Sequence, residues 1–373
     1  MKKTLLRLAI IAACASHMAY ANPTNMVTDT VDFSKAYQQY NQAVEANNPA
    51  DIISYAQQAY ELGTVKFGAH SIDSAKLAMN WANAIVAQSK QNNNGRVVQD
   101  EQVIKAQQLF ESALAVYRQK LPENDIALVD PLVGLAETTA DDTYAKKVLF
   151  EAIDIAQEAD NELTEAEVKT MAFYRLKSTE FYTRAVRGFA FDAYDIYVKK
   201  LPENAIKRVN ATYLYGALNE AMGKHTKAVD ALVEVIKQYQ ALPYSHPHEL
   251  RAHALLVDIY QKQGQSDQAT EHCIAIGKMT PWNDQQEQTP LFRTPPDYPM
   301  SYAKRGKSGW VKLQFTVDEQ GFVQSPQVLE SKGGSQFEKE SIEALSQWRY
   351  APKFVDGKPA KGTSTVRLDF TLG

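Results

Sequence analysis

The feature that most constrains the fold of this chain is an internal repeat with a period near 40 residues. The motif Leu-Pro-Glu-Asn begins at Leu121 and again at Leu201, and related segments lie midway between them at Leu163 and further on at Leu242. A repeat of this length is one supersecondary unit that cannot bury its apolar face alone. We therefore expect the units to stack on one another into an extended array.

Two of the repeats divide into two helical segments that are joined by a glycine turn. Apolar residues recur at intervals of three and four on both sides of Gly223 and of Gly264. An alanine lies five residues after each glycine, at Ala228 and Ala269, where it would allow the second helix to pack closely against the first. The pattern predicts paired helices over residues 22–279.

Small and aromatic residues at fixed places in these units carry a resemblance to a known family. They are Gly216, Gly223, Ala228, Tyr260, Gly264 and Ala269. With them, the segment from Phe33 to Lys278 resembles the tetratricopeptide repeat family, in the longer-period form of kinesin light chain-like arrays, although several units lack the usual turn glycine. The resemblance implies a curved solenoid whose surface binds peptides or proteins.

The first 21 residues are typical of an export signal. A basic start at Lys2 and Lys3 precedes a short apolar run, and Ala19-Tyr20-Ala21 fits a small-x-small cleavage site. The run is too short to span a bilayer comfortably, since about 20 apolar residues are needed. We predict cleavage after Ala21 and a location in the periplasm. A second interpretation stays open, because the segment ending at Cys14 resembles a lipoprotein box that would leave Cys14 lipid-anchored.

The charge and the cysteine content argue against a nucleic-acid partner, a strongly basic partner and an internal disulfide. The net charge is -4, which implies neither nucleic acid nor a strongly basic partner. From Pro290 onward there are 12 Lys and Arg against 9 Asp and Glu, so the tail is mildly basic. Removal of the signal would leave Cys273 as the only thiol, so no internal disulfide is expected. Cys273 lies at an apolar helical spacing, which predicts a buried position.

No residue pattern points to catalysis. The segment from His246 through His248 to His253 contains histidines five apart, whereas the metalloprotease motif needs two histidines four apart with a glutamate between them. The histidines are interpreted as loop and cap residues. The sequence contains no Gly-rich phosphate loop and no nucleophile elbow. We therefore predict no enzyme activity, no cofactor, no metal site and no small-molecule substrate.

The last quarter of the chain predicts a separate small domain. A proline-rich stretch, residues 280–294, is interpreted as a linker. Val311, Leu313, Phe315 and Val317 then alternate with polar residues, which predicts a half-buried strand. The turn from Asp318 to Gly321 leads into a returning strand, in which Pro326 favours an edge or bulge position.

A helix and a last strand complete this domain. Ser335 and Glu338 have the spacing of a capping box. Four residues that recur at helical spacing predict an apolar stripe, namely Phe337, Ser341, Leu345 and Trp348. Apolar residues alternate again up to Leu372. The order strand, strand, helix, strand (ββαβ) predicts an α+β domain in which one helix covers an antiparallel sheet.

An ordered set of residues in this domain carries a close resemblance to a second family. The set comprises Tyr298-Pro299, Gly309, the turn to Gly321, Phe337, Trp348-Arg349-Tyr350-x-Pro352 and Asp356-Gly357-Lys358-Pro359. With these motifs, residues 295–373 resemble the C-terminal domain of TonB-family proteins. Such proteins couple a motor of the inner membrane to transporters of the outer membrane in Gram-negative bacteria. Their C-terminal domain binds a short transporter peptide that adds as a strand to the sheet edge.

The resemblance implies roles for residues of this chain. The receiving edge would be the last strand, with Thr365, Val366, Arg367, Leu368, Asp369 and Phe370. Arg349, expected to point outward, and Tyr298 are candidates for partner contact. Structural roles are expected for Trp348, Tyr350, Pro352, Gly309 and Gly321.

Two departures from the family keep two functions open. Known transducers have an uncleaved membrane anchor and a proline-rich spacer, whereas this chain has a predicted cleavable signal and a helical array. A glutamine associated with transporter contact corresponds here to Pro295. The protein is interpreted as an accessory or transducer-like component of TonB-dependent transport, with transporter and motor proteins as partners. The alternative is a periplasmic scaffold for other envelope proteins, not coupled to energised transport.

Overall fold

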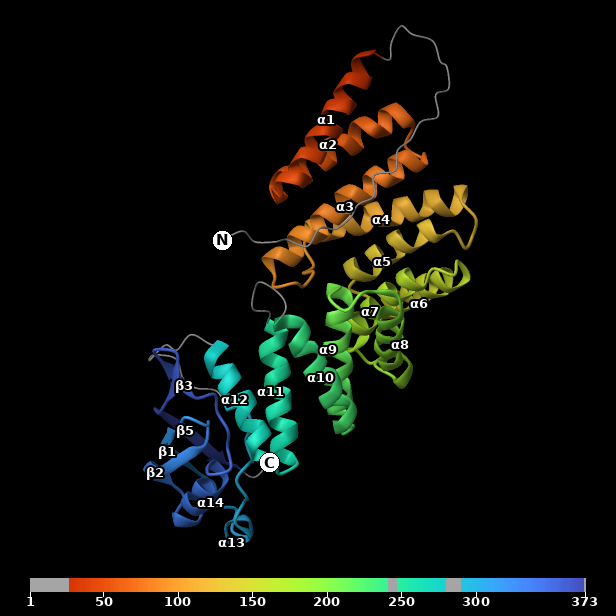
Figure 1. The fold of residues 1–373 in the computed structure, drawn as a ribbon. Helices are drawn as coiled ribbons and strands as arrows, with labels where there is room; N and C mark the ends of the chain where they lie inside the picture. Colours follow the sequence, from red (N-terminus) through yellow and green to blue (C-terminus); the bar gives the residue numbers. More distant parts are fainter. Residues whose placement is uncertain (1–26, 241–246, 280–289, 372–373) are drawn as a thin grey trace. The chain divides into compact units, whose positions relative to one another are not determined.

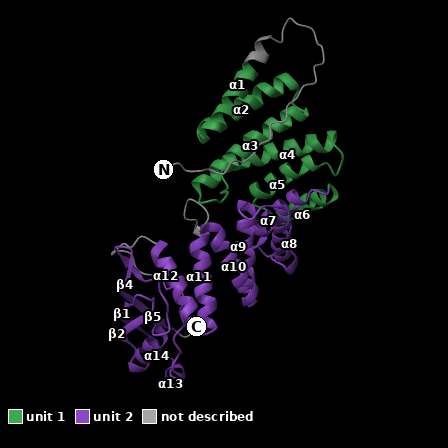
Figure 2. Cartoon of the chain, viewed as in Figure 1, with its two compact units in different colours: residues 1–159 green, residues 160–373 purple. Residues whose placement is uncertain are grey.

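The computed structural model describes residues 27–240, 247–279 and 290–371 and contains two compact units, residues 1–159 and 160–373 (Figure 2). The predicted export signal, including Cys14, and most of the predicted linker lie outside the described residues. Within the described ranges, no helix is both long and apolar enough to cross a membrane. The boundary between the units lies within the helical array, at a place that the sequence analysis does not predict.

The first unit is built of helices that pack in chain order, each against the next (Figure 1). They are α1 (Val27–Ala46), α2 (Pro49–Phe67), α3 (Ile72–Asn92), α4 (Glu101–Lys120), the 3-10 helix η1 (Ile126–Leu128), α5 (Val129–Thr138) and α6 (Asp142–Glu158). Their buried faces are rich in alanine, which allows neighbouring helices to approach closely. The prediction of paired helices is confirmed in this part of the chain.

The second unit begins with helices of the same kind. They are α7 (Glu162–Leu176), α8 (Arg184–Lys200), α9 (Ile206–Ala221), α10 (His225–Gln240), α11 (Pro247–Lys262) and α12 (Ser266–Met279). Gly223 and Gly264 form the turns inside the last two pairs at φ of 70° and 73°, a region that favours glycine. Ala228 and Ala269 are fully buried, as their predicted packing role requires.

The two complete copies of the repeated motif form the same turn. Leu121 and Leu201 each follow the last residue of a helix as its C-cap. The carbonyl of the next residue, Pro122 or Pro202, accepts a hydrogen bond from the backbone N–H three residues on, at 3.1 and 3.0 Å. Leu163 differs, because it lies inside α7 and not in a turn. The motif therefore marks the place where a helix pair ends.

The C-terminal part of the second unit is a small α+β domain. Its strands β1 (Gly309–Val317), β2 (Val323–Lys332) and β5 (Gly362–Phe370) form an antiparallel sheet in the order β2-β1-β5. Helix α14 (Ser335–Leu345) covers this sheet, and α13 (Met300–Ala303) precedes it. The predicted ββαβ order is confirmed. A small hairpin of β3 (Lys353–Val355) and β4 (Lys358–Ala360), which was not predicted, lies between α14 and β5.

The core of this domain lies between α14 and the sheet. All four residues of the predicted stripe are buried: Phe337, Ser341, Leu345 and Trp348. They pack with the inward-facing residues of β1, which are Val311, Leu313, Phe315 and Val317. The alternation along β1 and the helical spacing in α14 are therefore confirmed as two sides of one core.

The predicted capping box is wrong. Gly334 occupies the N-cap position at φ of 116°, an angle that residues with a Cβ rarely adopt, so Ser335 is already the first residue of the helix. No side chain caps the helix at this position. Glu338 instead accepts a hydrogen bond from the Ser331 hydroxyl of β2. The glutamate ties the helix to the sheet and not to its own first turn.

The end of the predicted linker belongs to the folded domain. The backbone N–H groups of Leu291 and Phe292 donate to the Arg349 carbonyl at 2.8 and 3.3 Å. The Arg349 N–H donates back to the Phe292 carbonyl at 3.0 Å, and the Trp348 indole Nε1 donates to the Thr294 carbonyl at 2.7 Å. Residues 291–294, at the end of the predicted linker, are therefore packed against the domain.

Truncation of Trp348 tests how much this core contributes to the stability of the domain. Trp348 is 2% exposed, so we expect Trp348→Ala to lower the free energy of unfolding of the domain by about 3–5 kcal/mol. Hydrogen exchange of the β1 and β5 amides in the full chain measures this loss, because it isolates one domain of a multi-unit protein. Trp310→Ala, at a partly exposed residue of β1, is the matched control and should cost much less. Equal exchange in the two variants would contradict the prediction.

Candidate functional site

Strand β5 lies at an edge of the sheet and pairs regularly along its whole length. Its partner among the described residues is β1, in register from Gly309 opposite Phe370 to Val317 opposite Gly362 without a shift. Every residue of the predicted edge, Thr365 to Phe370, lies in this strand. An edge strand exposes a row of unpaired backbone N–H and C=O groups to which an extended peptide can add.

The two faces of β5 differ in character. Val366 and Leu368 are half-buried against the core and Phe370 is fully buried, whereas the residues between them are exposed. On the exposed face, the Arg367 guanidinium lies 4.5 Å from the centre of the Trp310 ring and 2.8 Å from an Asp369 carboxylate oxygen. The inner face fixes the strand in place, and the outer face presents an ordered cation and a carboxylate.

The opposite edge, β2, is irregular. Its pairing with β1 shifts register between Lys312 and Leu313 and again between Gln314 and Thr316. Ser325 has a φ of 48°, and the next residue, Pro326, has no backbone N–H to donate. Bulges and proline are the devices by which edge strands avoid pairing with other chains. The prediction that Pro326 occupies an edge or bulge position is confirmed.

The residues predicted to be structural lie around the sheet. Trp348 and Tyr350 are buried in the core, and Pro352 follows them. A Cβ added at Gly309 would lie 2.1 Å from the Lys332 carbonyl oxygen, so only glycine fits where β1 begins.

Two further residues complete this part of the site. Gly321 has a φ of 85°, and a Cβ there would lie 2.2 Å from the Tyr350 carbonyl oxygen. Tyr298, a candidate for partner contact, donates its hydroxyl to the Lys307 carbonyl at 2.5 Å. Its ring packs edge-on against Phe337 and Phe370 of the core.

The expectation that Arg349 points outward is wrong. Its side chain is fully buried and donates to Gln261 Oε1 at 2.9 Å, to Thr270 Oγ1 at 2.8 Å and to the Gln320 carbonyl at 3.0 Å. Gln261 and Thr270 belong to α11 and α12. Spacing along the last helix could not show this, because the partners lie 88 and 79 residues away in the chain.

Cys273 is buried next to this arginine, as predicted from its spacing. Burial raises the pKa of its thiol to about 11, an effect that the nearby Arg349 guanidinium partly opposes. Because the thiolate is the reactive form, Cys273 is inert in the folded state.

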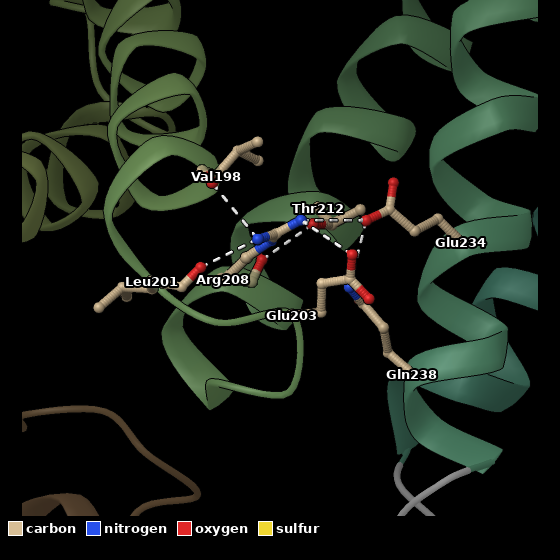
Figure 3. Close-up of polar contacts among 7 residues, drawn as sticks. All are labelled: Val198, Leu201, Glu203, Arg208, Thr212, Glu234 and Gln238. Atoms are coloured by element: carbon tan, nitrogen blue, oxygen red, sulfur yellow. Dashed lines mark hydrogen bonds and ion pairs between the residues drawn. The ribbon is translucent and has the colours of Figure 1, made fainter.

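A second arginine, the partly buried Arg208, holds three helices of the array together (Figure 3). Its Nη1 donates to the carbonyls of Val198 and Leu201 at 3.3 and 2.9 Å, which satisfies the free C-terminal end of α8. Its Nη2 lies 3.8 Å from the Glu234 carboxylate of α10 and 4.0 Å from that of Glu203. The sequence analysis missed this cluster, although Glu203 is part of the repeated motif. The arrangement is structural.

The described histidines of the predicted segment contact other aromatic rings. His246 lies outside the described residues, and His248 stacks on Tyr213 with 4.4 Å between ring centres. His253 is buried, with its Nδ1 2.8 Å from the Nδ1 of His272, so one neutral ring donates to the other. Across the described ranges, no group of three or more His, Cys, Asp or Glu side chains could hold a metal ion. The His253–His272 pair instead joins α11 to α12.

Comparisons with known proteins agree with this geometry. Residues 294–372 match the family model of the Gram-negative bacterial TonB protein C-terminal domain. Protein TonB of Pseudomonas aeruginosa is 39% identical over 83 residues, which are 22% of this chain and 24% of that protein. Protein TonB of Escherichia coli K12 is 38% identical over 72 residues, 19% of this chain and 28% of that protein. The chain therefore spans only about a quarter of the length of these relatives.

Solved structures are similar to each part of the chain. The solution NMR structure of the Pseudomonas aeruginosa TonB C-terminal domain is 33% identical, covers 24% of this chain and 89% of its own, and has a TM-score of 0.21. A crystal structure of nearly identical TPR-like repeats of the kinesin light chain type, from Podosopora anserina, is 18% identical and covers 53% of this chain and 92% of its own, with a TM-score of 0.42. Residues 294–372 are thus a TonB C-terminal domain, preceded by a helical array.

The His253–His272 pair predicts acid sensitivity of the last helix pair. Burial lowers the pKa of both His253 and His272 to about 4, from about 6.5 in an unfolded chain. The unfolded state therefore binds protons first, and stability is lost as the pH falls from about 6.5 to 4. Protonation of one of the two histidines should lower the free energy of unfolding by about 3 kcal/mol at pH 4, because a pKa difference of one unit corresponds to 1.4 kcal/mol.

Hydrogen exchange of α11 and α12 as a function of pH measures this loss in the full chain. In the double variant His253→Leu/His272→Leu the loss between these two pH values should disappear. The change His70→Leu, at an exposed histidine of the first unit, is the control and should retain it. An unchanged acid response in the double variant would exclude the pair as its source.

Proposed function

We propose that the protein works in the periplasm of a Gram-negative cell as an accessory or transducer-like component of TonB-dependent outer-membrane transport. In this proposal the C-terminal domain binds a peptide of a transporter as an added strand along β5. The helical array binds a second protein, for which a motor subunit of the inner membrane is the first candidate. The observation that carries the proposal is a regular, unbulged edge strand in a domain that matches the TonB C-terminal family.

The contrast between the two sheet edges supports strand addition at β5. An incoming strand needs consecutive backbone donors and acceptors on a straight edge. The nine consecutive pairs of β5 with β1 keep its outer side in such a geometry. On β2 the register shifts and Pro326 interrupt the row of backbone donors and acceptors that an incoming strand needs. Charged side chains at Arg367 and Asp369 would add specificity for a peptide with polar residues at matching positions.

The alternative is a periplasmic scaffold that uses the same domain for other envelope proteins. It is favoured by the extent of the match, which covers about a quarter of the curated TonB proteins and leaves the helical array outside it. Affinity purification of the full chain from envelope extracts separates the two functions. Recovery of TonB-dependent transporters supports the first proposal, and recovery of other envelope proteins without them supports the second.

The location depends on how the N-terminus is processed. We expect the mature protein to begin at Asn22, after cleavage of the signal that the sequence predicts. Mass spectrometry of the protein purified from cells measures this directly. A start at an acylated Cys14 would show a lipid anchor instead, and an intact Met1 would contradict both forms.

Site-directed disulfide cross-linking tests which edge receives the peptide. Thr365 of β5 and Gln327 of β2 lie opposite the same β1 residue, Gln314, and both are exposed. Each is changed to cysteine in a chain that also carries Cys14→Ser and Cys273→Ala. A transporter-derived peptide with one cysteine should cross-link at Thr365→Cys about tenfold more than at Gln327→Cys, the ratio that a preference of 1.4 kcal/mol produces.

The position of the peptide cysteine provides a further control. In an added strand, cross-linking should peak at one peptide position and fall at its neighbours, because successive side chains point to opposite faces. Equal yields at the two edges, or no dependence on peptide position, would contradict strand addition along β5.

A further inference from the structure

The C-terminal domain is packed against the last helix pair of the array. Within the second unit, Gly321, Arg349, Pro352 and Phe354 of the domain contact α11 and α12. The Arg349 guanidinium is at the centre, 3.8 Å from the centre of the Phe322 ring. Two of its acceptors, Gln261 and Thr270, belong to the helices, and the third, the Gln320 carbonyl, belongs to the domain.

The burial of this cation makes the contact specific. The acceptor groups of Gln261, Thr270 and Gln320 are neutral, and desolvation lowers the pKa of Arg349, although Cys273 and Asp318 oppose the effect. A charge that stays buried but loses its hydrogen bonds destabilises the folded protein strongly. A shift of the domain over α11 and α12 would break the hydrogen bonds to Gln261 and Thr270 while the guanidinium stays buried. The arginine therefore favours one docked geometry over partly shifted ones.

Apolar contacts surround the arginine. Val257, Cys273 and Ile276 of α11 and α12 form one buried cluster, against which Leu291, Phe292 and Ala351 of the domain pack. This cluster is continuous across the contact, as in the core of a single domain.

A glycine of α12 permits the closest approach. A Cβ added at Gly277 would lie 2.5 Å from the Pro352 carbonyl oxygen and 2.9 Å from the Phe354 ring. Gly277 is helical, so its φ does not require glycine. The residue is instead required by the domain that rests on it.

We propose that helices α11 and α12 and the C-terminal domain form one rigid module, and that Arg349 is the positioning residue that locks the sheet to the array. The backbone of Arg349 forms antiparallel bridges to Phe292 and Phe322. Because Phe322 follows the turn at the end of β1, Arg349 is linked directly to the sheet. A load or a ligand on β5 therefore acts on α11 and α12 through packed contacts, not through residues 280–289 alone. This role holds for any partner of the edge strand.

The reactivity of Cys273 reports on the lock. The thiol is fully buried at the contact, and it is the only cysteine left in a full-length chain that carries Cys14→Ser. Its rate of modification by a maleimide under native conditions measures the fraction of molecules in which the contact is open. Two substitutions open the contact from opposite sides: Arg349→Ala from the domain, and Gly277→Ala from the helix.

We expect each substitution to raise the modification rate about tenfold or more, since a hydrogen bond to a charged group contributes at least the equivalent of one factor of ten. Gly277→Ala is the sharper variant, because alanine is the better helix former and by itself stabilises α12. Gly188→Ala, in a helix with open space around the site, and Arg367→Ala, at an exposed arginine, are the matched controls. Both should leave the rate within about twofold of the parent chain, the size of an ordinary surface effect.

Denaturant dependence separates opening of the lock from global unfolding. Local opening exposes little surface, so the modification rate should depend weakly on urea below the unfolding transition. The proposal is overturned if Arg349→Ala and Gly277→Ala react no faster than their controls. It is also overturned if their faster reaction follows urea with the full slope of global unfolding. Neither result depends on a transporter peptide, so they leave the proposed function untouched.

Discussion

Each helix of the array has an apolar stripe that a neighbouring element must cover, and the rest of the structure depends on this constraint. An array of such helices has two ends, and each end leaves one stripe without a further repeat to cover it. At the C-terminal end, Cys273 and Ile276 of α12 are buried under residues of the C-terminal domain. The domain therefore serves as the cap of the array as well as a folded unit with its own core.

The two edge strands of the sheet differ in regularity. This difference favours strand addition at one edge, β5, over the other, β2. Strand β2 has bulges and Pro326, which prevent pairing, while β5 keeps a continuous register. A free regular edge is an aggregation hazard unless it has a partner for part of its life. The retention of a regular edge at β5, opposite the bulged edge at β2, is the physical reason for which we propose binding at β5. The polar outer face at Arg367 and Asp369 limits unspecific association.

The sequence predicted what depends on local patterns and missed what depends on distant partners. Helix pairs follow from apolar spacing and from turn glycines such as Gly223, and the order of strands follows from alternation along β1. The capping box at Ser335 failed because Gly334 takes the cap position at an angle suited to glycine. Arg349 was misplaced because its acceptors come from α11 and α12, and no periodicity of its own segment encodes a partner 88 residues away. Arg208 was missed although Val198 and Leu201 are near in the chain, because no periodicity marks a side chain that turns back to the end of the preceding helix.

Arg349 joins the C-terminal domain to α11 and α12 through a buried charge, which is less stabilising than apolar packing but more specific in geometry. Apolar residues of similar volume often give equal or greater stability, because the charge must be desolvated. They would also tolerate sliding of the domain over α12, since apolar contacts have little directional preference. A planar guanidinium has donors in a fixed fork, so it accepts few geometries. In the proposed module Arg349 fixes the orientation of β5 relative to α11 and α12. The proposed binding of a partner along β5 under load would need a defined orientation more than additional stability.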